Sequence, residues 1–178
     1  LWQKRIQTGP SDYMLNFFYT NKSKKIYAAG GRYINPIDDF SKPHFKVLDD
    51  SANVLFTKEW TDSAYSDGAI VFDRKLSDSL RPDQLLVVCG IDTAVKINSA
   101  TNFYFYNSAR IAGVDTNFNI IWQKNLCDRL EIAYWTNAKA LKNGRVIVIG
   151  RKEDSSTLEW RGWATLLDDN GHEIWDRT

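Results

Sequence analysis

A chain of 178 residues is long enough for one domain, and a content of 43% apolar and 13% aromatic residues is typical of a globular protein rich in strand-forming side chains. Its net charge of +1 provides no field that would draw it to nucleic acid or to an anionic membrane surface. We therefore expect no nucleic-acid partner. No apolar run approaches the roughly 18 residues that a spanning helix requires, so we expect no membrane insertion either.

The local pattern predicts strands throughout and no helix. Short runs rich in Val, Ile, Tyr and Phe are bounded by Gly, Asp, Asn and Ser. In chain order, the expected strands are 13–20, 25–32, 44–48 and 53–60; 69–76, 85–91, 104–114 and 118–125; and 133–141, 146–152, 160–167 and 172–176. The second strand of each group is almost continuously apolar, which predicts cover on both faces, whereas the fourth alternates and is expected nearer the outside.

The clearest hairpin signal runs from Leu166 to Trp175. An apolar strand end leads into Asp-Asp-Asn-Gly, a turn sequence that permits positive φ, and the outgoing strand contains the tryptophan. Weaker copies lie upstream, and residues 1–4 match residues 121–124 at all but the first position. Four tryptophans recur with this signal and are expected to be structural: Trp2, Trp60, Trp122 and Trp175.

A second marker has the same period. An apolar run that ends in glycine precedes each hairpin, and these glycines, Gly30, Gly90 and Gly150, lie sixty residues apart. Two markers with one period predict three units, at residues 10–60, 61–125 and 126–178, within a single domain of residues 1–178.

These markers resemble a known family. The order of a glycine, a gap and then Leu-Asp-x-x-Gly-x-x-x-Trp is similar to the β-propeller repeat of large secreted bacterial surface proteins, and the hairpin resembles the tryptophan-docked blades of quinoprotein-like propellers. The resemblance implies a propeller-like domain of about three four-stranded antiparallel blades plus one extra N-terminal strand. It also implies an extracellular, cell-surface or periplasmic location. Because propellers close with about four to eight blades, we expect the chain to be part of a larger propeller, or to complete its ring with another chain.

A second fold fits the same strand count. A β-trefoil also contains three units of four strands and would close at this length without help. Its repeat is usually shorter, and its inner strands need not be apolar on both faces as residues 85–89 are, so we favour the propeller.

Few residues suggest chemistry. His44 and His172 lie in different units and are interpreted as exposed polar residues, so no metal site is expected. The aspartates at 49–50, 115 and 168–169 are interpreted as turn formers, because the alternating ligands of a calcium loop are missing. Cys89 is interpreted as a small buried residue and Cys127 as an incidental thiol, with a disulfide as the alternative.

Binding residues are expected in the loops that join the second and third strands of each unit, because such loops often carry function. The candidates in these loops and at the strand ends that precede them are Arg32, Tyr33, Asp92, Lys96, Arg151 and Lys152. The aromatic residues at 103–106, Trp160 and Trp163 are interpreted mainly as packing between units, with a platform for a sugar or a peptide as the alternative.

The functional hypothesis is a non-catalytic scaffold or binding module for protein–protein or surface interactions, without a cofactor. Its expected partner is another protein or the remaining blades of the same propeller, and carbohydrate is a further possible ligand. Two alternatives remain open. One is a part of a propeller enzyme, with Asn16, Asp73 and Asn137 facing a central axis; the other is a sugar-binding trefoil.

Overall fold

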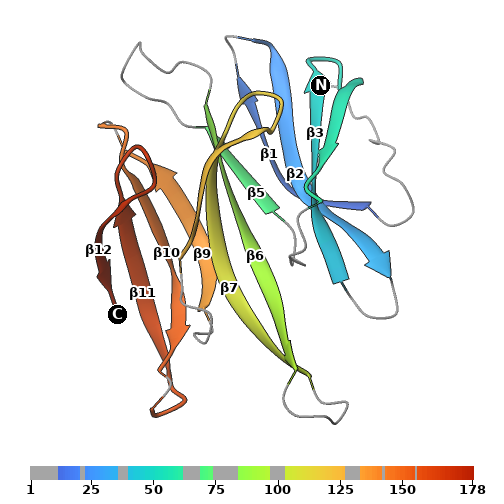
Figure 1. The fold of residues 1–178 in the computed structure, drawn as a ribbon. Coiled ribbons are helices and arrows are strands. Elements are labelled where there is room, and N and C mark those ends of the chain that lie inside the picture. The colour runs from blue at the N-terminus through green and yellow to red at the C-terminus, as the bar shows by residue number, and fades with distance from the viewer. Residues whose placement is uncertain are drawn as a thin grey trace.

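The computed structural model describes residues 12–20, 23–35, 40–61, 69–73, 84–96, 103–126, 133–141, 143–154 and 156–178. Within these ranges the chain forms three separate four-stranded antiparallel sheets (Figure 1). The all-β prediction is therefore confirmed. The β-trefoil alternative requires a closed barrel, and the described residues form none; each sheet is a meander of consecutive strands.

All twelve predicted strands are present. The first sheet contains β1 (Asp12–Thr20), β2 (Lys25–Asn35), β3 (Phe40–Asp49) and β4 (Val54–Glu59). The second contains β5 (Ala69–Asp73), β6 (Leu85–Lys96), β7 (Phe103–Val114) and β8 (Ile120–Asn125). The third contains β9 (Ala133–Ala140), β10 (Val146–Glu153), β11 (Trp160–Leu167) and β12 (Glu173–Arg177).

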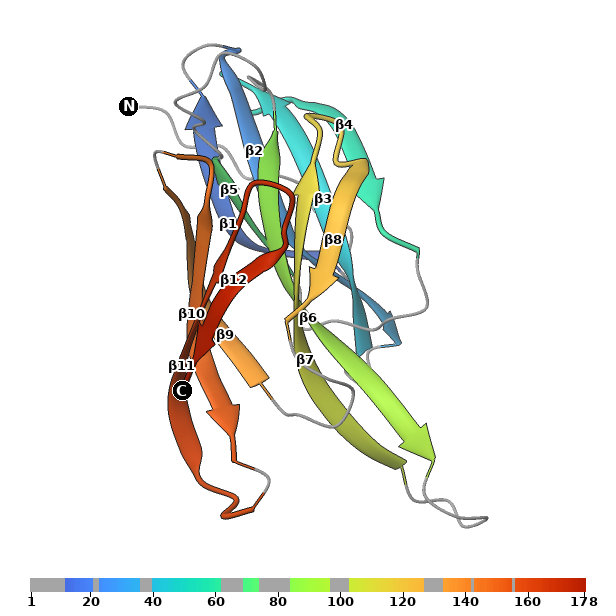
Figure 2. The ribbon, with the colours of Figure 1, turned by 60° about the vertical axis from the view of Figure 1, so that its left-hand side comes forward.

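The sheets follow one another in series, with the second between the other two (Figures 1 and 2). Their first strands converge, because β5 lies against β1 and β2, and β9 lies against β5, β6 and β7. One apolar cluster joins the first two sheets and includes Tyr27, Phe45 and Phe118. Another joins the second and third sheets and includes Ile111 and Trp163.

Strand β6 is covered on both faces, as its continuous apolar run predicts. Its alternate side chains enter different clusters: Leu85, Val87 and Cys89 face the first sheet, whereas Leu86 and Val88 face the third. All five residues are buried. The interpretation of Cys89 as a small buried residue is confirmed, and Cys127 lies outside the described residues.

The same turn joins the third and fourth strands of each sheet. It begins at Asp49, Asp115 or Asp168, and one carboxylate oxygen accepts hydrogen bonds of 2.8–2.9 Å from the backbone N–H groups two and four residues later. The fourth residue of each turn has positive φ: 58° at Ala52, 58° at Phe118 and 84° at Gly171. The interpretation of these aspartates as turn formers is confirmed.

The pairing register differs from the predicted sixty-residue glycine spacing. Three residues pair with the position just before the turn aspartate: Ile26, Leu85 and Val146. Four residues later stand Gly30, Cys89 and Gly150, so Gly90 lies one position further along its strand. A bulge in β1 or β9 lies opposite Gly30 and Gly150. At Gly150 a β-carbon would clash with the Tyr134 carbonyl oxygen, which explains the glycine there.

The tryptophans also differ in position. Trp122 lies opposite Gly113, and Trp175 lies opposite Leu166, at the same register. Phe56 holds that position in the first sheet, and Trp60 stands four residues later, directly after β4. Trp60 and Trp122 are therefore not equivalent, although both contact the next sheet. Trp2 lies outside the described residues.

Candidate functional site

All six candidate binding residues lie in strands, and three of them, Tyr33, Asp92 and Lys96, were predicted to lie in loops, so β2 and β6 extend further than predicted. Arg32 and Tyr33 belong to β2, Asp92 and Lys96 to β6, and Arg151 and Lys152 to β10. Strand β6 pairs with β7 as far as Lys96, opposite Phe103. Backbone hydrogen bonds between the two strands continue past the apolar residues 85–89 and include the polar residues that follow them, so the strand is longer than its apolar run. The C-terminal ends of β2, β6 and β10 point to the same end of the molecule (Figure 1).

In the first sheet the two candidates, Arg32 and Tyr33, have different environments. Arg32 forms an ion pair with Glu59 of β4 at 3.2 Å, and Tyr33 is half-buried. Partly exposed ion pairs of this kind contribute little to stability. The side chains of Asp92 and Lys96 lie outside the described part of the chain, so the second sheet adds only their backbone positions.

The third sheet carries a cation beside two adjacent aromatic rings. The Arg151 guanidinium lies 5.2 Å from the Tyr134 ring centroid and 4.8 Å from that of Trp160. The two rings are 5.3 Å apart. Tyr134 is directly opposite Arg151 on β9, and Trp160 comes from β11 on the other side. Trp160 is 43% exposed and Arg151 is exposed as well, so this group, the Arg151 cluster, can contact a partner.

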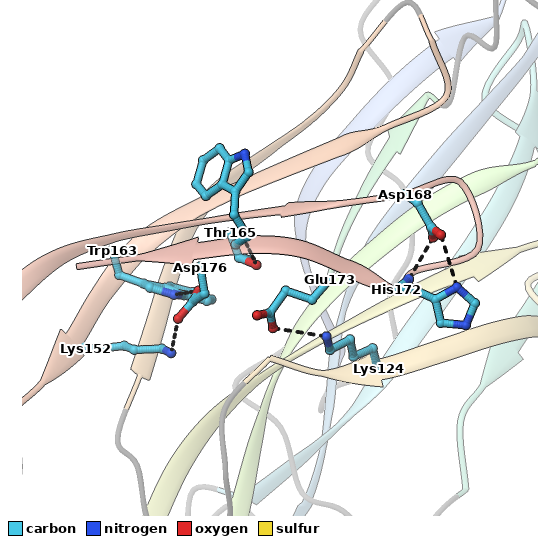
Figure 3. A network of polar contacts seen from close by, with 9 residues as sticks. Lys124, Lys152, Trp163, Thr165, Asp168, His172, Glu173 and Asp176 are labelled. Carbon is cyan, nitrogen blue, oxygen red and sulfur yellow. Dashed lines mark hydrogen bonds and ion pairs between the residues drawn. The ribbon is translucent and has the colours of Figure 1, made fainter.

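Lys152, the adjacent candidate, points to the opposite face and is engaged within the sheet. Its Nζ lies 2.9 Å from Asp176 Oδ2 of β12 and 4.9 Å from the ring centroid of Trp163. Trp163 Nε1 donates a hydrogen bond to the other Asp176 oxygen (Figure 3). This ion pair is largely shielded from solvent, so Lys152 stabilises the third sheet and is a poor ligand contact.

The turn beside the Arg151 cluster is fixed by Asp154. Hydrogen bonds from the hydroxyl and backbone N–H of Ser156 lower the pKa of the Asp154 carboxyl group. The Arg161 guanidinium, 3.0 Å from that carboxyl group, lowers the pKa further. The ordered turn presents Leu158, which is 71% exposed and has a φ of 58°. The cluster and this turn together form an exposed surface with aromatic, cationic and aliphatic groups.

The aromatic residues proposed as a platform have different environments. Trp163 is buried in the cluster between the second and third sheets, whereas Trp160 is exposed. The packing interpretation is therefore confirmed for Trp163, and only Trp160 of the two can contact a ligand. The side chains of residues 103–106 lie outside the described ones. Tyr134 was not predicted; its position two residues before a bulge and opposite Arg151 depends on strand pairing.

The interpretation of both histidines as exposed is wrong for His44. His44 is 2% exposed and lies in β3 on the same face as Lys46, which is 4% exposed; β3 is an inner strand, paired with β2 and β4 on its two sides. His172 is exposed, and its Nδ1 lies 3.1 Å from Asp168 Oδ2 within the turn. Among the described residues no group of three or more His, Cys, Asp or Glu side chains could hold a metal ion.

The structure adds little support for the three residues considered as part of an enzyme site on a central axis. Asn137 is exposed, and its Oδ1 accepts a hydrogen bond from the backbone N–H of Ala138. The side chains of Asn16 and Asp73 lie outside the described part.

Comparisons with protein families and with curated proteins assign no family or function to this chain. No protein-family model matches this chain, and no curated protein matches it either. Over the ranges that the structure describes, there is no helix of the length and apolarity needed to cross a membrane.

Proposed function

We propose that this chain is part of a β-propeller that acts as a non-catalytic scaffold or binding module, exported or displayed at a cell surface. The observation that carries the proposal is the convergence of the first strands, with β5 against β1 and β2, and β9 against β5. In a propeller the sheets meet through their first strands near an axis and are wedged apart by large side chains further out. The stacked rings of Phe45 and Phe118, 4.5 Å apart, and the tilted pair of Phe45 and Trp60, at 4.9 Å, fit such a wedge.

The Arg151 cluster is the surface that we assign to binding, and a protein is the partner that it suits best. Arginine, tyrosine and tryptophan are the residue types that dominate the energetics of protein interfaces. Here all three are held together, and beside them Asp154 accepts hydrogen bonds from the backbone N–H groups of Ser156 and Leu158. A surface with fixed side chains loses less conformational entropy on binding.

Site-specific photo-crosslinking in the cells that produce the protein tests this proposal. A photoreactive amino acid at position 158, on the exposed turn, is expected to capture a protein partner. The same probe at position 57, an exposed residue of β4 in the first sheet, is the control and should capture none. Arg151→Ala, which removes an exposed side chain, should abolish capture at position 158 without lowering the urea midpoint.

Three results would count against this assignment. Capture that is equal at both positions, or that survives Arg151→Ala, would exclude the Arg151 cluster as the binding surface. Specific binding to an oligosaccharide array that is lost in Trp160→Ala would make carbohydrate the ligand instead. Turnover of any bound compound by the purified protein would refute the non-catalytic role.

A further inference from the structure

One face of each sheet has the same apolar design; among the described residues that face is covered in the first two sheets and only partly covered in the third, where Leu166 is 8% exposed. We call this the forward face; it carries Tyr27 and Ala29 in the first sheet, Leu86 and Val88 in the second, and Ile147 and Ile149 in the third, at equivalent register. Ala29 and Val88 are 0% exposed beneath the following sheet, whereas Ile149 is 43% exposed. Ile147, Ala164 and Trp175, on the same face, are only half-buried.

We infer that the forward face of the third sheet is built to receive a fourth four-stranded sheet of the same kind. The inference rests on the proposed propeller and names the partner of this face. An outermost sheet in a stacked array normally has a polar outer face, because that face stays in water. Here isoleucines continue the pattern of the covered sheets at the centre of β10, and the polar residues of the same face surround them: Asn137 and Lys139 on β9, Arg151 further along β10, and Arg177 on β12.

The outer strand specifies how the fourth sheet would dock. The Trp122 indole is held between two glycines: Gly113 of its own sheet, and Gly171, the left-handed turn residue of the next sheet. A β-carbon at Gly171 would lie 2.5 Å from that ring. Trp175 occupies the register position of Trp122 and is half-buried. The incoming sheet should therefore place glycine at its own left-handed turn position, against Trp175.

A basic residue two positions after that aromatic residue makes the next contact. Lys58 Nζ donates to Asn119 Oδ1 of the second sheet at 3.3 Å, and Lys124 Nζ lies 3.2 Å from Glu173 Oε2 of the third. Arg177 stands at the same position in β12 and is exposed. It should reach a polar or acidic side chain where the fourth strand of the incoming sheet begins.

The opposite end of the stack argues against the first sheet of a second copy as the occupant. The rear face of the first sheet, which would have to cover Ile149 in such a dimer, carries Ala28, Leu48 and Ala52. These residues are 2%, 0% and 4% exposed within this chain, so that face is already covered. A further sheet of the same design fits the open forward face without uncovering anything.

The test extends the full chain by a second copy of residues 126–178 placed after Thr178. This junction reproduces the spacing from β8 to β9, since Arg177 corresponds to Lys124. The extended protein should show a higher urea midpoint for the original third sheet, and the β10 amides should exchange more slowly with solvent. Trp175→Ala should erase most of this shift in the extended chain and change the original chain little.

Two variants control the geometry. Gly171→Leu in the added copy alone, which puts a side chain where the Trp175 indole should lie, should also remove the shift. Ile174→Ala, at the exposed bulge residue next to Trp175, should have the same small effect in both chains.

The outcomes separate this inference from the proposed binding surface. An unchanged midpoint in the extended chain, whether or not the added copy folds, would overturn it. Self-association of the original chain that Ile149→Lys abolishes would also overturn it, because the occupant would then be a second copy. Failure of crosslinking at position 158 would leave the midpoint experiment unaffected, so the two proposals can fail independently.

Discussion

Phe118 offers a stringent test of how the first two sheets are joined. It occupies the left-handed position of its turn, with a φ of 58°, yet its side chain is 0% exposed. Its ring stacks on Phe45 at 4.5 Å and meets the edge of Tyr27 at 6.0 Å. Its carbonyl oxygen accepts a hydrogen bond of 3.0 Å from Trp60 Nε1. A residue with an unfavourable backbone conformation is thus retained for its packing across the interface.

Replacing Phe118 by alanine and by glycine separates these two effects. Loss of a fully buried phenylalanine ring should lower the free energy of unfolding by about 3–5 kcal/mol in Phe118→Ala. Glycine loses the same ring contacts but relieves the left-handed strain, which costs an L-residue about 1–2 kcal/mol. After the greater entropy of glycine in the unfolded chain is subtracted, we expect Phe118→Gly to be about 1 kcal/mol more stable than Phe118→Ala.

Equilibrium urea unfolding, followed by tryptophan fluorescence and by circular dichroism, measures these differences. Phe56→Ala is the control, since Phe56 lies on the outer strand with 38% of its surface exposed and should cost about 1 kcal/mol or less. Two results would refute the reasoning. A Phe118→Ala protein close to wild type would mean that the ring does not hold the sheets together, and a glycine variant less stable than the alanine variant would mean that the left-handed strain is absent.

Two further predictions concern a glycine and a turn. Gly150→Ala should lower the free energy of unfolding by about 1–3 kcal/mol, because the new methyl group meets the Tyr134 carbonyl oxygen of the adjacent strand. Gly162→Ala is the control and should be nearly neutral in the same urea assay, because no atom lies within 4 Å of its new β-carbon. Equal effects of the two substitutions would contradict the steric argument. Burial raises the pKa of Asp115, but hydrogen bonds from the Asn119 side chain and backbone outweigh it and lower that pKa below the ordinary value of 3.8. The stabilisation from this carboxylate is present above pH 3.8 and is lost as the pH falls through the lower folded-state pKa. Asp115→Asn should therefore be less stable than wild type at neutral pH, and the difference in their free energies of unfolding, measured in urea titrations, should narrow below pH 3.8. A difference that stays constant with pH would contradict the assignment.

The sequence by itself determined the strands and the turns. All twelve strands could be predicted because alternation and continuous apolar runs are properties of neighbouring residues. The turn aspartates could be predicted for the same reason, since Asp168 bonds backbone groups only two and four residues away. Cover of β6 on both faces followed from the unbroken run of Leu85 to Cys89.

Only the tertiary structure decided the register between strands and the contacts between sheets. Gly90 fits a regular spacing in the sequence, but pairing with β7 puts Cys89 at the position of Gly30 and Gly150. The equivalent positions Ile26, Leu85 and Val146 are 59 and 61 residues apart, and a difference of one residue leaves the local pattern unchanged. The Arg151 cluster likewise joins side chains from three strands, and Lys152 is held by Asp176 of a fourth. Such contacts depend on backbone pairing over long sequence separations, which no local pattern of residues encodes.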